Sequence, residues 1–236
     1  MLLLGHMCWA YVTGRFCSSR LGVGINPYLI LFLGALPDVD VLLGGMGIEH
    51  RGITHSVLFW SIAFVPVFFK YRKQSIPYFV AVIQHILFGD LVVNRTDPFW
   101  PFGFNFGLRV DLFSIENILL ETAGLAIFLI LATRKNDRKM FLGKNRRNLL
   151  CILPLIPLVT FLLFVYQQDI QFLLEHEAKS KALDKVIRWT TESDLQSFVI
   201  IAHSILAAFL LIPLIQGLRA LAKKSMPFTS STLCQF

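Results

Sequence analysis

The chain has 236 residues, of which 55% are hydrophobic and only 16% are charged. Globular domains contain about 25% charged residues, and a soluble protein of this size still needs a wetted surface. The composition therefore excludes a disordered or collagen-like chain, and four cysteines without paired spacing exclude a disulfide scaffold. It predicts an integral membrane protein of the all-α class, built as a polytopic helical bundle.

The placement of the basic residues explains the positive charge. The formal net charge of +7 is by itself compatible with a nucleic-acid partner. However, seven Lys and Arg residues fall within 134–147, between two apolar stretches, as in a cytoplasmic loop of a membrane protein. We therefore expect a lipid bilayer as partner and no nucleic acid.

Apolar stretches predict the elements in chain order. They lie at about 2–14, 21–37, 55–70, 76–94, 113–133, 148–166 and 197–218, and we expect about five to seven membrane helices from them. The second, third and fourth stretches are short or contain Asp, His or Pro, which predicts tilted or kinked helices. The first has no basic residue before it and no small-residue cleavage site, so we expect a retained helix rather than a signal peptide.

The whole chain, 1–236, is predicted to form a single membrane domain. Its motifs fall in residues 1–125, and residues 126–236 form a helical half with a polar extracytoplasmic insertion at 167–196. If the N-terminus lies outside, Lys and Arg on the inner side outnumber those on the outer side by roughly two to one. We therefore expect a multi-pass protein of the cell (inner) membrane with a cytoplasmic C-terminus.

The same topology brings His and Asp residues to one end of the bundle. Histidines and aspartates fall near the outer ends of the first four stretches: His6, Asp38, Asp40, His50, His55, His85 and Asp90. Ionisable groups at membrane depth are costly unless they are paired. A metal ion neutralises carboxylates and binds neutral imidazoles, so we expect one or two divalent ions, with Zn²⁺ favoured and Mn²⁺ or Fe²⁺ as alternatives.

Local spacing and sequence context support a metal-binding role more strongly for some of these residues than for others. Asp38 and Asp40 point the same way if the backbone after Pro37 is extended, and His55 begins a helix if Gly52 turns the chain and Thr54 caps that helix. Taken singly, the two aspartates also fit a solvated helix end, and His50 and His55 a wetted loop. His85 and Asp90 are harder to explain in this way, because both lie inside an apolar run.

Several of these strings resemble a known family. Five motifs resemble those of the YdjM-like family of membrane-bound proteins, which are described as metal-dependent hydrolases. They are an N-terminal His, Leu36-Pro-Asp-Val-Asp40, His50-Arg-Gly-Ile-Thr-His-Ser56, the His85/Asp90 pair and Pro98-Phe-Trp-Pro101. The resemblance covers about residues 1–125 and implies a helical membrane protein with a divalent-metal hydrolase centre formed by the seven His and Asp residues.

One departure from the family pattern concerns the last pair. The family spaces its final His and Asp four residues apart, whereas His85 and Asp90 are five apart. Five residues of a regular α-helix turn the side chains about 140° away from each other. A π turn at Gly89 would bring them nearly into line.

The resulting hypothesis is a hydrolase that acts at the outer membrane–water interface on a lipid, lipid-linked or phosphoester substrate. Asp90 or Asp40 would take a proton from water, and Arg51, less securely Arg109, would bind an anion. Aromatic residues form either a substrate lip or, more in keeping with membrane proteins, an interfacial belt; they are Phe99, Trp100, Phe102, Phe104 and Phe106.

Two other classes of protein need similar residues. A metal or proton transporter also places His and Asp in the membrane, but it needs polar groups along the whole path, and the inner halves of these stretches are almost purely apolar. A non-catalytic scaffold stabilised by metal needs the same ligands as a hydrolase. The oligomeric state is not determined by the sequence.

Overall fold

The computed structural model describes residues 3–46, 51–93, 96–104, 106–108 and 115–137, with single positions between 201 and 219. These residues are mostly helical, which confirms the predicted helical class, and the β-type pairing among them is an isolated bridge between Thr96 and Phe106. The predicted stretch 148–166 and the polar insertion 167–196 lie outside the described residues.

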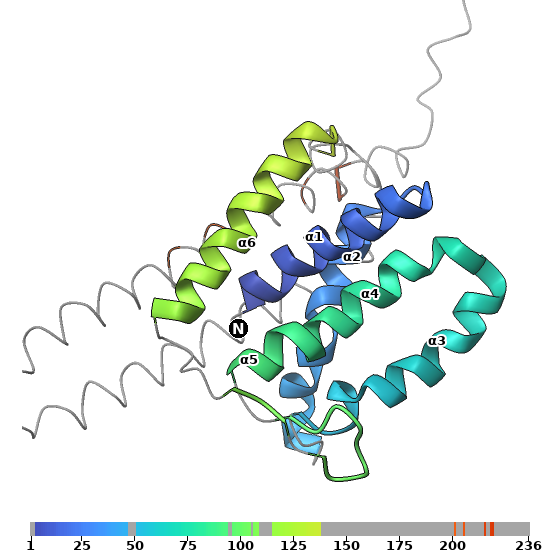
Figure 1. The fold of residues 1–236 in the computed structure, drawn as a ribbon, viewed down its shortest axis with the longest axis vertical. Coiled ribbons are helices and arrows are strands. Elements are labelled where there is room, and N and C mark those ends of the chain that lie inside the picture. The colour runs from blue at the N-terminus through green and yellow to red at the C-terminus, as the bar shows by residue number, and fades with distance from the viewer. Residues whose placement is uncertain are drawn as a thin grey trace, which may run out of the picture.

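The helices follow one another as shown in Figure 1. They are α1 (Leu3–Leu21), α2 (Pro27–Ala35), the 3-10 helices η1 (Pro37–Met46) and η2 (Ile53–His55), α3 (Val57–Tyr71), the 3-10 helix η3 (Arg72–Gln74), α4 (Ile76–Gln84), the π turn η4 (His85–Asp90), α5 (Leu91–Val93) and α6 (Ile115–Arg134). Helix α6 agrees with the predicted stretch 113–133, whereas the predicted stretch 76–94 is divided by the π turn. Among the described helices, none combines the length and the apolar character that crossing a bilayer requires.

Local side-chain chemistry sets where two of the helices begin. Asn26 caps α2 by accepting hydrogen bonds from the backbone N–H groups of the first turn, and Pro27 fits the first helical position because its missing N–H has no partner there. Ser56 caps α3 by accepting from Phe59 N. The expectation that Thr54 caps this helix is wrong, because residues 53–55 form a separate 3-10 turn before it.

Helix α1 is the central helix and packs against α2, α4 and α6 (Figure 1). Two glycines allow its close contact with neighbouring backbone. A Cβ on Gly34 would lie 2.4 Å from Ala10 Cβ, and one on Gly14 would lie 2.8 Å from Ile30 Cδ1. Small residues of this kind let helices approach closely, and here they hold α2 against α1.

The helices that pack against α1 differ in their direction relative to it. Gly34 lies beside Ala10 and Gly14 beside Ile30, so α1 and α2 are antiparallel. Tyr11 and Arg15 contact Asp137 just beyond the end of α6, which makes α1 and α6 parallel. Basic residues of the described helices gather at the end where α1, α3 and α6 finish: Arg15, Arg20, Lys70, Arg72, Lys73 and Arg134.

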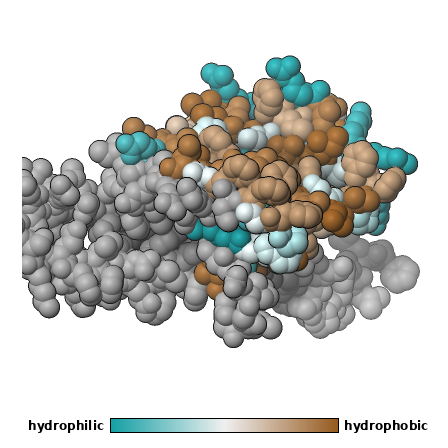
Figure 2. Space-filling view, turned by 60° about the horizontal axis from the view of Figure 1, so that its bottom comes forward, coloured by the Kyte–Doolittle hydropathy of each residue, from teal (hydrophilic) through white to brown (hydrophobic). Residues whose placement is uncertain are grey.

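Much of the described surface is apolar. Figure 2 shows hydrophobic side chains over the visible face, with hydrophilic ones gathered along its upper edge. Helix α3 has no buried residue, and it exposes Ile62, Val65, Phe68 and Phe69. A contiguous apolar surface on a folded chain marks contact with a membrane or another protein.

Candidate metal centre

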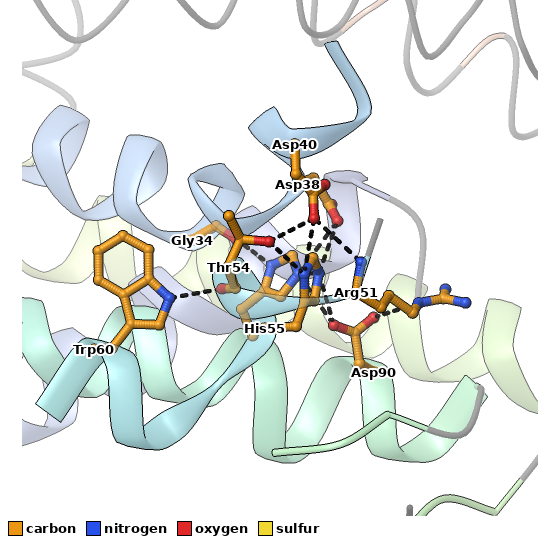
Figure 3. A network of polar contacts seen from close by, with 9 residues as sticks. Gly34, Asp38, Asp40, Arg51, Thr54, His55, Trp60 and Asp90 are labelled. Carbon is orange, nitrogen blue, oxygen red and sulfur yellow. Dashed lines mark hydrogen bonds and ion pairs between the residues drawn. The ribbon is translucent and has the colours of Figure 1, made fainter. Parts of the chain in front are cut away.

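The described His and Asp residues of the predicted site meet at one end of the bundle. His6 comes from the start of α1, Asp38 and Asp40 from η1, His55 from η2, and His85 with Asp90 from the π turn. All six are buried, and Figure 3 shows Asp38, Asp40, Asp90 and Arg51 gathered around His55. His50 lies outside the described residues.

The π turn at the end of α4 aligns His85 with Asp90. Residues His85–Asp90 form a π-helical segment, whose i to i+5 spacing places the two side chains on the same face. Asp90 Oδ2 consequently lies 3.3 Å from His85 Nε2. The prediction of a π turn at this position is confirmed. Gly89 is needed within it, because a Cβ there would lie 2.1 Å from His6 Cε1.

A backbone carbonyl fixes the orientation of the His85 ring. His85 Nδ1 lies 2.7 Å from Gly34 O, and a carbonyl oxygen can only accept, so Nδ1 carries the proton. Nε2 then faces the other polar groups, with its lone pair available when the ring is neutral. A ligating histidine is held in this way in most metal sites.

Asp40 holds the second imidazole from behind. Its Oδ2 lies 3.2 Å from His55 Nδ1 and accepts hydrogen bonds from the Thr54 hydroxyl at 2.5 Å and from Arg51 N at 3.2 Å. His55 Nε2 therefore faces the same space as His85 Nε2, at a separation of 3.3 Å.

The condition under which Asp38 and Asp40 would point the same way, an extended backbone after Pro37, is not met, because η1 is a 3-10 helix. At three residues per turn, side chains two positions apart diverge by about 120°. Asp38 and Asp40 therefore contact opposite nitrogens of His55 instead of pointing the same way. Asp38 Oδ1 lies 3.5 Å from Nε2, and Asp40 Oδ2 faces Nδ1.

Four atoms converge on a common space: His55 Nε2, His85 Nε2, Asp38 Oδ1 and Asp90 Oδ2. His55 Nε2 lies 3.1 Å from Asp90 Oδ2 and 3.5 Å from Asp38 Oδ1, and His85 Nε2 lies 3.3 Å from each of those oxygens. In a tetrahedral zinc site with bonds of 2.0–2.2 Å, neighbouring ligand atoms are about 3.3–3.5 Å apart. His55 Nε2, His85 Nε2 and Asp90 Oδ2 therefore have the mutual spacing of neighbouring ligand atoms around one ion, and Asp38 Oδ1 lies beside both imidazoles.

A divalent cation would balance the charges in this cluster. Burial alone would raise the pKa of Asp38, but the His85 and His55 imidazoles hold this pKa well below its ordinary value. Asp90 Oδ2 is buried and accepts no hydrogen bond. Protons on both imidazole Nε2 atoms would set like charges 3.3 Å apart, whereas a divalent ion balances both carboxylates and leaves both rings neutral.

His6 lies against the same cluster. Its ring stacks on that of His85, with the centroids 3.7 Å apart and the planes 18° from parallel. Its Nδ1 is buried without a hydrogen-bond partner, and it forms with Asp38 and His85 a second group whose donor atoms lie within 4.8 Å of one another. This position is compatible with a second ion beside the first.

Arg51 borders the cluster on its accessible side. Its backbone has a φ of 67°, an unusual value for a residue other than glycine, so the left-handed turn expected at Gly52 occurs one residue earlier. Its side chain is 27% exposed, and Nε lies 3.8 Å from Asp90 Oδ1. The arginine is therefore positioned to meet a ligand entering the site.

The aromatic residues predicted as a lip or belt are exposed on a loop attached to the site. Phe102 is 66% exposed. Pro98 O accepts from Val57 N, and Trp100 O accepts from the Ser56 hydroxyl, so the loop is bonded to the residues that follow His55. Arg109, the second predicted anion-binding arginine, lies outside the described residues.

Sequence reasoning did not identify two residues that shape the centre. Gly34 supplies the carbonyl that orients His85, and the Trp60 indole N–H donates to Thr54 O at 2.7 Å. Both stand in apolar runs, where neither spacing nor charge distinguishes them. Their partners are 51 and six positions away along the chain.

The geometry agrees with a comparison to known proteins. The YdjM inner membrane protein family matches residues 1–170, and these residues include every described member of the cluster. No curated protein and no solved structure shows a significant match. The chain belongs to the YdjM family of inner membrane proteins.

Proposed function

We propose that this protein is a divalent-metal-dependent hydrolase acting at the outer surface of the inner membrane on a lipid or lipid-linked phosphoester. The observation that carries the proposal is the buried group of His55 Nε2, His85 Nε2 and Asp90 Oδ2, which lie 3.1–3.3 Å from one another as neighbouring zinc ligands do, with Asp38 Oδ1 beside both imidazoles. Zn²⁺ suits this mixed set best, with Mn²⁺ or Fe²⁺ as alternatives.

The chain supplies distinct roles around the ion. His55, His85, Asp38 and Asp90 hold it, and His6 extends the set toward a second ion. Once bound, a metal of this type polarises a phosphoryl oxygen and lowers the pKa of bound water to about 7.

The two candidate bases differ in their surroundings. Asp40 is fully buried and already accepts from Thr54 and Arg51, so we assign it the positioning of His55. Asp90 keeps its Oδ1 toward the accessible side, where Arg51 lies, and is the better base for taking a proton from water. Arg51 would bind a phosphoryl oxygen through its planar guanidinium.

Helix direction supports the outer placement of the site. The basic residues at the ends of α1, α3 and α6 lie opposite the His and Asp cluster. Basic ends of membrane helices face the cytoplasm, which favours an outer position for the cluster. The exposed aromatic loop beside His55 fits the interfacial level of a bilayer.

A transporter is supported less well. A conducting path would continue the polar cluster through the bundle. Within the described part of the chain, the next polar group along α1 is the Arg15, Tyr11 and Asp137 contact. Met7 and Ala10 of α1, which stand between His6 and Tyr11, are buried and apolar.

The experiment that tests the proposal is metal analysis of detergent-purified protein, followed by an assay of headgroup release from mixed lipids. We expect one or two equivalents of a divalent ion in the wild type, loss of that ion in His55→Ala and His85→Ala, and metal-dependent headgroup release. A wild-type protein free of divalent metal would refute the hydrolase. Bound metal without release from any lipid would favour the scaffold.

A further inference from the structure

A cavity of about 630 Å³ lies between α2, α3 and α4, close to the metal centre. Its lining is largely apolar and comes from all three helices: Leu29, Leu33, Trp60, Ala63, Val67 and Tyr78 are among its residues. Its size is within the range of small-molecule binding sites, about 300–1,000 Å³. Ala63 and Val67 remain exposed, so the cavity is accessible from the side of α3.

Trp60 lies at the end of the cavity that is nearer to the metal centre. Its indole N–H donates to Thr54 O, next to His55. Tyr71 lines the other end. Eleven residues of helix rise about 16 Å, which is about half of the ~30 Å hydrocarbon core of a bilayer. The cavity therefore has the length of an acyl chain in one leaflet.

The wall on the outer side of this cavity is a helix that lipid is expected to surround. On its other face α3 exposes Ile62 and Phe69, 64% and 65% accessible, and the family is one of inner membrane proteins. A lipid acyl chain that enters beside Ala63 would thus move from the hydrocarbon of the bilayer into a cavity that is also apolar. A smaller hollow of about 330 Å³ also touches Phe64, but Trp60 is not among its lining residues.

We propose that this cavity binds one acyl chain of a bilayer lipid, whose headgroup then lies beside the cluster of His55, His85, Asp38 and Asp90. Arg51, at the accessible edge of that cluster, faces the headgroup phosphate. The identification of this lipid as the substrate rests on the proposed function. Binding of the acyl chain does not, because the cavity contains none of the candidate metal ligands.

The test uses the full-length protein in detergent and a phosphatidylglycerol that carries a photoreactive diazirine in the middle of one acyl chain. After illumination, labelled residues are mapped by mass spectrometry as the lipid concentration is raised. We expect labelling at Ala63 and Val67 that saturates near one lipid per chain. Labelling that rises without saturation, or that is equal on Ile62 and Ala63, would overturn the proposal, because either result would indicate lipid bound only to the outer surface of α3.

Two matched variants locate the site. Ala63→Phe fills the cavity, and Ile62→Phe adds the same ring to the outer face of the same helix turn. We expect Ala63→Phe to reduce labelling of Val67 at least about tenfold and Ile62→Phe to leave it within about twofold. Val67→Phe, with labelling read at Ala63, replaces Ala63→Phe if that variant does not fold, and helix content by circular dichroism together with the gel-filtration profile reports the folding of each.

The outcomes separate this inference from the proposed function. Saturable labelling of a protein that binds no metal would support the acyl-chain site while refuting the hydrolase. Bound metal and hydrolysis of a water-soluble phosphoester, without labelling of Ala63 or Val67, would overturn the acyl-chain site alone. Absence of labelling because another part of the chain occupies the cavity also overturns it.

Discussion

Replacing Asp40 with Asn tests whether this carboxylate binds the metal or positions a ligand. The substitution keeps the size of the side chain and removes its charge. In the structure Asp40 Oδ2 lies behind His55, on the Nδ1 side, 3.2 Å from that nitrogen. The four converging donor atoms lie on the Nε2 side of the ring. Asp40→Asn should therefore weaken the metal site without removing a ligand.

The expected size of the effect follows from this position. Loss of a carboxylate behind a ligating histidine typically reduces metal affinity 10- to 100-fold, which corresponds to about 1.4–2.7 kcal/mol. An Asn at this position can still accept the hydrogen bond from Thr54, so we expect the lower half of that range. His85→Ala removes a ligand and should abolish stoichiometric binding.

The assay is a competitive zinc titration of purified protein against a chromophoric chelator. Asp97→Asn is the matched control, because the Asp97 carboxylate accepts from two backbone N–H groups of its own loop, those of Phe99 and Gly103. The zinc affinity of this variant should equal that of the wild type. If Asp40→Asn loses binding as completely as His85→Ala, Asp40 is itself a ligand. An unchanged affinity would show that its contact with His55 has no effect on the site.

Three further predictions concern the site and its support. Gly89→Ala should lower zinc content, because its Cβ would meet the His6 ring at 2.1 Å. Gly24→Ala is the control and should retain zinc, because no atom lies within 4 Å of the added Cβ; equal zinc loss in both variants would contradict the role of the π turn. Tyr11→Phe should reduce the free energy of unfolding in detergent by about 1.5–3 kcal/mol, because it removes a buried hydrogen bond to the Asp137 carboxylate. Its zinc affinity should equal that of the wild type, and a lower affinity would show coupling between the two ends of α1. Zinc retention measured by dialysis should fall as the pH is lowered, because protons compete for the ligating imidazoles, and retention that is unchanged at pH 5 would exclude histidine ligation.

The sequence alone was sufficient for the properties that depend on local composition and spacing. A deficit of charge and long apolar runs predicted helices, and the five-residue interval between His85 and Asp90 predicted the π turn that the structure contains. The strings that resemble the YdjM family predicted a membership that the match over residues 1–170 confirms. Periodicity and hydropathy are local, so they can be read before the chain folds.

Tertiary structure decided the roles within the site. Asp38 and Asp40 are two residues apart and chemically identical, yet the 3-10 turn of η1 directs one toward His55 Nε2 and the other toward Nδ1. The orientation of His85 depends on Gly34 O, 51 positions away. The cavity beside Trp60 exists only because three helices leave space between them. Contacts between distant residues set these features, and spacing along the chain does not encode which partner each side chain will meet.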